Sequence, residues 1–105
     1  MNITVVGAGN MGLAMTGYIA GKKEDTVCLF TGKDIGTIEV YDIEKCSKFK
    51  TDDYICTDDP NVAFKKADVI FVTYPAFLRR KFIEEYSEYI NEGTYLGFVP
   101  GYGGA

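Results

Sequence analysis

Short apolar runs alternate along the chain with longer segments whose apolar residues recur every three or four positions. The runs are rich in β-branched and aromatic residues, which is typical of strands, and the longer segments are typical of helices. Strands are predicted at Asn2 to Val6, Thr26 to Phe30, Thr37 to Tyr41, Tyr54 to Thr57, Val69 to Tyr74 and Thr94 to Val99. Helices are predicted at Asn10 to Ala20, Pro60 to Lys66 and Ala76 to Ile90.

Each predicted helix has an apolar side that we expect to face a sheet. In the first helix this side consists of Met11, Ala14, Met15, Tyr18 and Ile19, and Gly21 is expected to end the helix. In the second, which Asp58, Asp59 and Pro60 begin, it consists of Val62, Ala63 and Ala67. In the third it consists of Leu78, Phe82, Tyr86, Tyr89 and Ile90.

The order of these elements is β-α-β, a detour, and then β-α-β. In the detour, Ile38 and Val40 point to one side of a strand. The polar stretch from Ile43 to Lys50 predicts a surface excursion, for example a hairpin, and not a helix. The other strands predict a Rossmann-type, doubly wound α/β fold: a mostly parallel sheet in the order 3-2-1-4-5 with helices on both faces. Ligands of such sheets bind over the carboxyl ends of the strands, here at the first and fourth.

A glycine motif joins the first strand to the first helix. Its residues are Gly7, Ala8, Gly9, Asn10, Met11 and Gly12, in the pattern G-x-G-x-x-G. The first glycine permits a sharp turn, the second lets a pyrophosphate approach the backbone, and the third lets the helix pack on the strand. Phosphates would then lie on the helix N-terminus. The strand before the motif and the helix after it favour dinucleotide binding over a turn that only packs the two elements together.

The loop after the second strand bears on the choice between NAD and NADP. An acidic residue here would bind both ribose hydroxyls and select NAD. The chain instead has Thr31, a glycine and Lys33, whose hydroxyl and ammonium suit a 2′-phosphate, and we therefore favour NADP over NAD. Asp34 is the counter-argument, because it could reach the ribose if the loop folds back.

A basic run, Arg79-Arg80-Lys81, lies in the first turns of the third helix. The helix dipole disfavours positive charge there. We interpret the run as a solvated face with acidic neighbours, in preference to a patch that faces an anionic ligand.

Composition narrows the class of protein. A chain of 105 residues is the size of one domain, and its net charge of −4 argues against nucleic acid as a partner. No segment reaches the length of a membrane span, and no signal peptide is visible, so we expect a cytoplasmic protein that does not bind membranes. Cys28, Cys46 and Cys56 are expected to be reduced thiols, and with no histidine present we expect no metal site.

Three segments together resemble the octopine/nopaline (opine) dehydrogenase family. They are Val5 to Gly12, the turn Val72 to Phe77, and the terminal stretch Pro100 to Ala105. Members of that family couple an amino acid to a 2-oxo acid reductively with NADH or NADPH. The resemblance implies that residues 7–12 hold the pyrophosphate and that Thr31 and Lys33 lie at the adenosine ribose. It places Tyr74, Pro75, Ala76 and Phe77 at the nicotinamide half, with Pro100 to Gly104 near the nicotinamide and the substrate.

The resemblance covers the cofactor domain only. Residues 1–105 would form the dinucleotide-binding domain, while the helical domain that supplies a His-Asp pair in such enzymes is absent from this sequence, so we expect a fragment that cannot catalyse the reaction alone. Ketopantoate reductases and glycerol-3-phosphate dehydrogenases share the glycine motif, and a non-catalytic dinucleotide sensor is a further alternative. The apolar strand Tyr95 to Val99 would lie at an edge, where we expect self-association.

Overall fold

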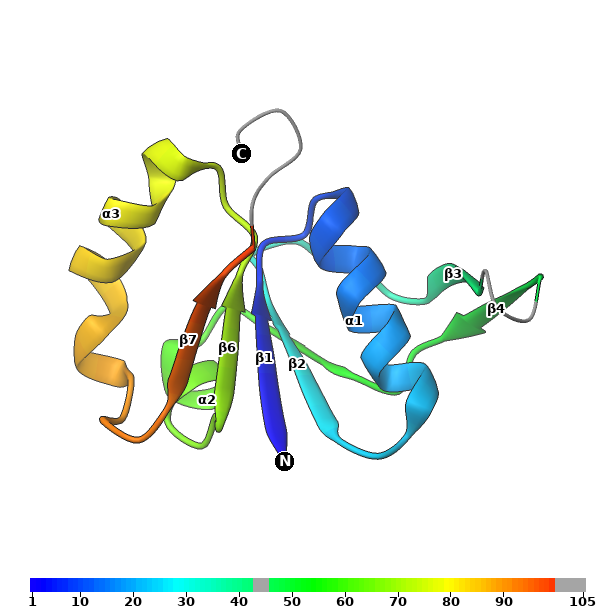
Figure 1. Ribbon diagram of the computed structural model, residues 1–105, viewed down its shortest axis with the longest axis horizontal. Helices are drawn as coiled ribbons and strands as arrows, with labels where there is room; N and C mark the ends of the chain where they lie inside the picture. The colour runs from blue at the N-terminus through cyan, green and yellow to red at the C-terminus, as the bar shows by residue number, and fades with distance from the viewer. Residues whose placement is uncertain (43–45, 100–105) are drawn as a thin grey trace.

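The computed structural model describes residues 1–42 and 46–99, and its main body is a five-stranded parallel sheet. In spatial order the strands are β5 (Ile55–Thr57), β2 (Thr26–Phe30), β1 (Asn2–Val6), β6 (Val69–Val72) and β7 (Tyr95–Phe98). Counted along the chain within this sheet, the order is 3-2-1-4-5, so the predicted Rossmann-type fold is confirmed (Figure 1).

The register brings the carboxyl ends of all five strands to one edge. Val6 is level with Phe30 on one side and with Val72 on the other, and these two are level with Thr57 and Phe98. The residue that follows each strand therefore lies along the same edge, which is the upper one in Figure 1. Residues far apart in the sequence meet there, at the place where open α/β sheets bind ligands.

The two faces of the sheet carry separate apolar cores. On one face α1 (Asn10–Lys22) packs over β1 and β2, where the buried residues are Val5, Ala20, Val27 and Leu29. The opposite face is covered by α2 (Pro60–Phe64) and α3 (Ala76–Tyr86), which a 3-10 turn η1 (Ser87–Tyr89) prolongs. Aromatic rings fill this second core. The centroid of the Phe64 ring lies 4.7 Å from that of Phe30 and 5.7 Å from that of Phe82.

The inward side of α1 differs from the prediction. Gly12, Thr16, Gly17 and Ala20 are buried, whereas the predicted Met11, Ala14 and Tyr18 are exposed and Met15 and Ile19 are only partly buried. Small residues lie inward because the helix runs close to its neighbours. The helix also continues past Gly21, and Lys23 ends it in the left-handed region (φ 59°).

The predicted excursion is a hairpin of β3 (Ile38–Asp42) and β4 (Ser47–Thr51), although residues 43–45 of it lie outside the described part. It packs against α1 through two glycines. A Cβ added to Gly17 would lie 2.2 Å from Val40, and one added to Gly21 would lie 2.6 Å from the ring of Phe49. Gly21 is thus a packing residue, which is why its expected role as the helix stop was wrong.

Smaller corrections concern the other helices. In α2, Asp59 caps the first turn as expected by accepting a hydrogen bond from the Asn61 amide at 2.9 Å. Val62, however, is exposed, and the core position belongs to Phe64, which the prediction did not place inward. Helix α3 ends at Tyr86 before the 3-10 turn. Its core side contains the predicted Phe82, Tyr86, Tyr89 and Ile90 and also Ile83, which was not predicted, whereas the predicted Leu78 is not part of this core.

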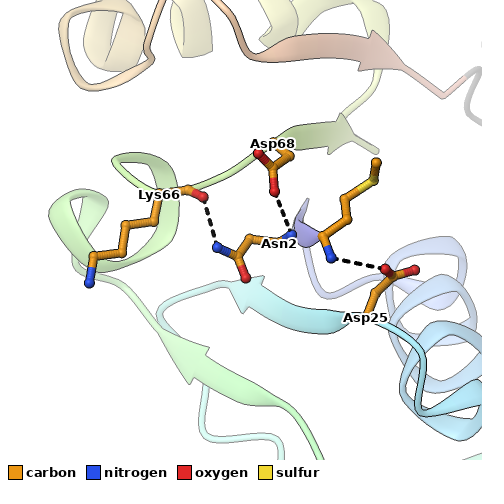
Figure 2. Close-up of polar contacts among 5 residues, drawn as sticks. Asn2, Asp25, Lys66 and Asp68 are labelled. Atoms are coloured by element: carbon orange, nitrogen blue, oxygen red, sulfur yellow. Dashed lines mark hydrogen bonds and ion pairs between the residues drawn. The ribbon is translucent and has the colours of Figure 1, made fainter.

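The amino end is fastened at the opposite edge of the sheet. The Asn2 amide donates to Asp68 at 2.8 Å, and the Asn2 side chain donates to the carbonyl of Lys66 at 3.0 Å. The terminal ammonium pairs with Asp25 at 3.2 Å, as Figure 2 shows. These contacts join the start of β1 to the connections on both of its sides, so the strand that leads into the glycine turn is held along its whole length.

Candidate dinucleotide site

Two glycines of the turn after β1 are sterically required. Gly7 has φ +105°, a conformation that L-residues rarely adopt, and a Cβ on it would lie 2.6 Å from the Thr73 hydroxyl. A Cβ on Gly12 would lie 1.8 Å from the carbonyl oxygen of Gly7. The turn is held from the side as well, since the Thr73 hydroxyl donates to the carbonyl of Val6 at 2.7 Å.

Gly9 is different, because a Cβ on it would meet nothing within 4 Å. It is the N-cap of α1, no side chain caps the helix, and no acidic residue lies in the first turn. The amides of Asn10, Met11 and Gly12 are therefore available to an anion, with the positive end of the helix dipole behind them. The open space at Gly9 is where such an anion could approach the backbone.

A cavity of about 530 Å³ opens beside this turn. It is lined by Gly7, Ala8, Gly9, Phe30, Thr31, Gly32, Lys33, Asp58, Tyr74 and Tyr86. Six of the predicted cofactor residues thus meet around one space. Asn10, Met11 and Gly12 begin the adjoining helix without lining the cavity, and Pro75, Ala76 and Phe77 lead away into α3, where Phe77 is 80% exposed. The predicted segment 100–104 lies outside the described residues.

The loop after β2 is a compact turn at the mouth of the cavity. The Thr31 amide donates to the carbonyl of Thr57 at 2.9 Å, and the Lys33 amide donates to the Thr31 hydroxyl at 3.2 Å. Lys33, an exposed residue, lines the cavity, whereas Asp34 does not. The loop therefore presents a cation to the cavity, and its neighbouring acid lies elsewhere.

The other four lining residues are Gly32, which lies between the predicted Thr31 and Lys33, and Phe30, Asp58 and Tyr86, which lie outside the predicted segments. Asp58 follows β5 directly, and the rule that ligands lie over strand ends, applied to this third strand of the sheet, would have found it. Tyr86 reaches the site from the far end of α3, with its ring centroid 5.2 Å from that of Phe30, and the sequence carries no signal for this. Burial, and to a lesser extent the nearby Glu85 carboxylate, raise the pKa of both Tyr74 and Tyr86. Both phenols therefore stay protonated and can donate hydrogen bonds.

The basic run in α3 divides into two kinds of residue. Arg80 and Lys81 are exposed and pair with Glu84 and Glu85 one helical turn away, as expected of a solvated face. The expectation was wrong for Arg79, which is partly buried and donates to the carbonyl oxygens of Tyr74 and Val99. Two backbone acceptors at its head explain why this arginine is turned away from solvent.

Neither a metal cluster nor a membrane helix appears in residues 1–42 and 46–99. No group of three or more His, Cys, Asp or Glu side chains is placed to hold a metal ion there. No helix in the same residues is long and apolar enough to cross a bilayer.

Comparison with known families decides where the chain belongs. The family model described as ketopantoate reductase PanE/ApbA matches residues 3–99. The chain belongs to the PanE/ApbA family. Ketopantoate reductases are one of the alternatives to the opine dehydrogenases that the glycine motif left open. No curated protein matches the sequence.

Solved structures share the PanE/ApbA chain's fold. Octopine dehydrogenase with NADH and agmatine superposes with a TM-score of 0.77 at 23% identity over 94% of this chain. The NADH and L-arginine complex of octopine dehydrogenase gives 0.75 at 22% over 94%. The dimeric ketopantoate reductase from Staphylococcus aureus gives 0.57 at 15% over 94%. The chain spans 28% of the octopine dehydrogenase chains and 33% of the reductase.

Proposed function

We propose that this chain is the part of an NAD(P)-dependent reductase that binds the nicotinamide dinucleotide. The observation that carries the proposal is the glycine turn: Gly7 and Gly12 are needed for its shape, while Gly9 is open on the side of the cavity. Packing alone explains the first and third glycines, but it gives no reason for a bare backbone at the second. A pyrophosphate that needs close approach to the helix N-terminus gives that reason.

The cavity suggests how the dinucleotide would lie. Its pyrophosphate would rest on residues 7–12, its adenosine half toward Thr31 and Lys33, and its nicotinamide half toward the turn from Tyr74 to Phe77. When bound, the cofactor supplies a hydride. The chain's own residues would hold it through backbone amides, the Lys33 ammonium and the protonated Tyr74 and Tyr86 phenols.

Two reactions remain in competition for the whole enzyme. The family favours reduction of a 2-oxo acid of ketopantoate type. Reductive coupling of an amino acid to a 2-oxo acid is favoured by the three segments that resemble opine dehydrogenases, and the TM-scores are higher with octopine dehydrogenase than with the ketopantoate reductase. We prefer the opine-type reaction because the turn from Val72 to Phe77 carries the resemblance. In either case a further domain would supply the acid–base group and most substrate contacts. Assay of the longer protein with ketopantoate, and with pyruvate plus arginine, distinguishes the two.

Calorimetric titration of the chain with NADH and with NADPH tests the binding itself. We expect saturable binding of both, with NADPH favoured because Lys33 lines the cavity. A tenfold preference corresponds to about 1.4 kcal/mol. Absence of heat with either cofactor at high concentration, together with unchanged amide shifts of Gly9 and Asn10, would overturn the proposal.

A further inference from the structure

Arg79 joins the ends of two neighbouring strands. Its Nε donates to the carbonyl oxygen of Tyr74 at 3.3 Å, just after β6, and its Nη2 donates to that of Val99 at 3.1 Å, just after β7. Its guanidinium carbon lies 5.4 Å from the centroid of the Phe98 ring. One side chain on α3 thus binds the turn that begins its own helix to the adjacent strand end.

Charge pairing does not explain this placement. Arg79 lies in the first turns of α3, where the helix dipole disfavours a cation, and none of the ion pairs within residues 1–42 and 46–99 involves it. The next residue, Arg80, has its Nε 3.6 Å from Glu84 and is almost fully exposed. A planar fork of donors suits two carbonyls at different angles in a way that a lysine ammonium on a flexible stem does not.

One of the two carbonyls belongs to a residue that lines the cofactor cavity, and the other belongs to the strand end hydrogen-bonded beside it. Tyr74 lines the cavity, and the Val99 amide in turn donates to the carbonyl of Val72 at 2.9 Å. The turn after β6 is therefore fixed from two sides, by Thr73 on the carbonyl of Val6 and by Arg79 on the end of β7. Loss of Arg79 would free the side nearer to α3 while the glycine turn stayed intact.

We propose that Arg79 is a positioning residue, which holds the turn from Tyr74 to Phe77 in the shape that receives the nicotinamide half of the dinucleotide. This inference rests on the proposed function. It separates the two halves of the site: the adenosine half depends on the glycine turn and the loop after β2, and the nicotinamide half depends on the Arg79 bridge.

The test compares NADH with adenosine diphosphate ribose, which lacks only the nicotinamide. Affinities of both ligands are measured by calorimetry for the full chain, for Arg79→Ala, for Arg79→Lys, and for Arg80→Ala as the matched control on the same helix. We expect Arg79→Ala to weaken NADH about tenfold and to leave adenosine diphosphate ribose unchanged. Arg79→Lys keeps the charge without the fork and should show most of the same loss, while Arg80→Ala should change neither affinity.

The outcomes separate this inference from the proposed function. If wild-type chain binds neither ligand, the proposed function fails. If it binds both equally well, or if Arg79→Ala weakens both by the same factor or neither, the positioning role is wrong. Circular dichroism checks that the variants fold, and if Arg79→Ala does not, the ratio of the two affinities in Arg79→Lys decides.

Discussion

The carbonyl oxygen of Gly7 lies 1.8 Å from the point where a Cβ on Gly12 would stand. The loop after β1 and the first helical turn of α1 therefore lie in close backbone contact. Gly7 could not move away easily, because its own Cβ position is 2.6 Å from the Thr73 hydroxyl, and that hydroxyl is bonded to Val6. The motif is therefore tightly packed at Gly7 and Gly12, whereas a Cβ on Gly9 would meet no protein atom within 4 Å.

Gly12→Ala is expected to destabilise the fold. The new methyl group would overlap a backbone oxygen, so α1 or the turn must shift, and overpacking of this kind costs about 1–3 kcal/mol. For a chain of this size each kcal/mol lowers the Tm by roughly 4–8 °C. Thermal unfolding followed by circular dichroism measures the change, and a Tm within about 1 °C of wild type would show that the close contact is absent.

Gly9→Ala is the matched variant with the opposite expectation. Gly9 has φ −75° and ψ −174°, which alanine adopts without strain, and the new methyl would meet no protein atom within 4 Å. We expect an unchanged Tm, but about tenfold weaker binding of NADH and NADPH, because the methyl occupies the approach of the pyrophosphate. Unchanged affinity in the folded variant would place the phosphates elsewhere.

Much of this site could be predicted from the sequence, because its residues directly follow the carboxyl ends of strands. Buried strands are marked by apolar runs, and the topology rules then bring Gly7, Thr31 and Tyr74 to one edge without knowledge of side-chain contacts. Asp58 was missed because its strand is short and the acid was assigned to a helix start.

The side of α1 that packs inward could not be read in the same way. Periodicity identifies large apolar residues such as Met11 and Tyr18, but a helix in close contact with its neighbours buries its smallest ones. Gly17 lies inward because Val40, from a hairpin more than twenty residues away, occupies the space beside it. The position of Arg79 was not predicted for a related reason. Its two hydrogen-bond acceptors are backbone carbonyls, which no pattern of side chains in the sequence reveals.

Lys33 and Asp58 line the same cavity with opposite charges, so they should set the choice between the two cofactors. Lys33→Ala is expected to weaken NADPH about two- to fivefold relative to NADH, the range of an exposed charge pair. Asp58→Asn removes the opposing charge and should shift the ratio toward NADPH. Parallel titrations with both cofactors measure the ratio. If Lys33→Ala leaves the ratio unchanged, Lys33 does not contact the 2′-phosphate.

Strand β7 forms an edge of the sheet and exposes apolar side chains. Tyr95 is 65% exposed, and Phe98 is 38% exposed. A sheet edge with such residues favours pairing with another chain, so this chain should self-associate as its concentration rises. Tyr95→Lys should reduce that association, because a charge on the edge opposes it. Size-exclusion chromatography over a wide range of concentrations tests both statements, and an elution volume that stays monomeric for wild type would contradict them.

Cys28 lies in the core between the sheet and helices α2 and α3, with 7% of its surface exposed. We expect it to lower the free energy of unfolding at high pH. Burial, together with the nearby Cys56, raises its pKa from 9.0 to about 11. Well below pH 9 the thiol is protonated in both the folded and the unfolded state, so it does not make the free energy of unfolding depend on pH. Between about pH 9 and 11 the unfolded chain loses this proton first, so the free energy of unfolding decreases as pH rises. Urea unfolding across this range, compared with Cys28→Val, isolates the effect, because the tyrosines whose pKa is also raised are common to both proteins. Whatever its absolute stability, the variant's free energy of unfolding should fall less steeply with pH. Equal slopes would mean that the Cys28 thiol ionises at the same pH in both states.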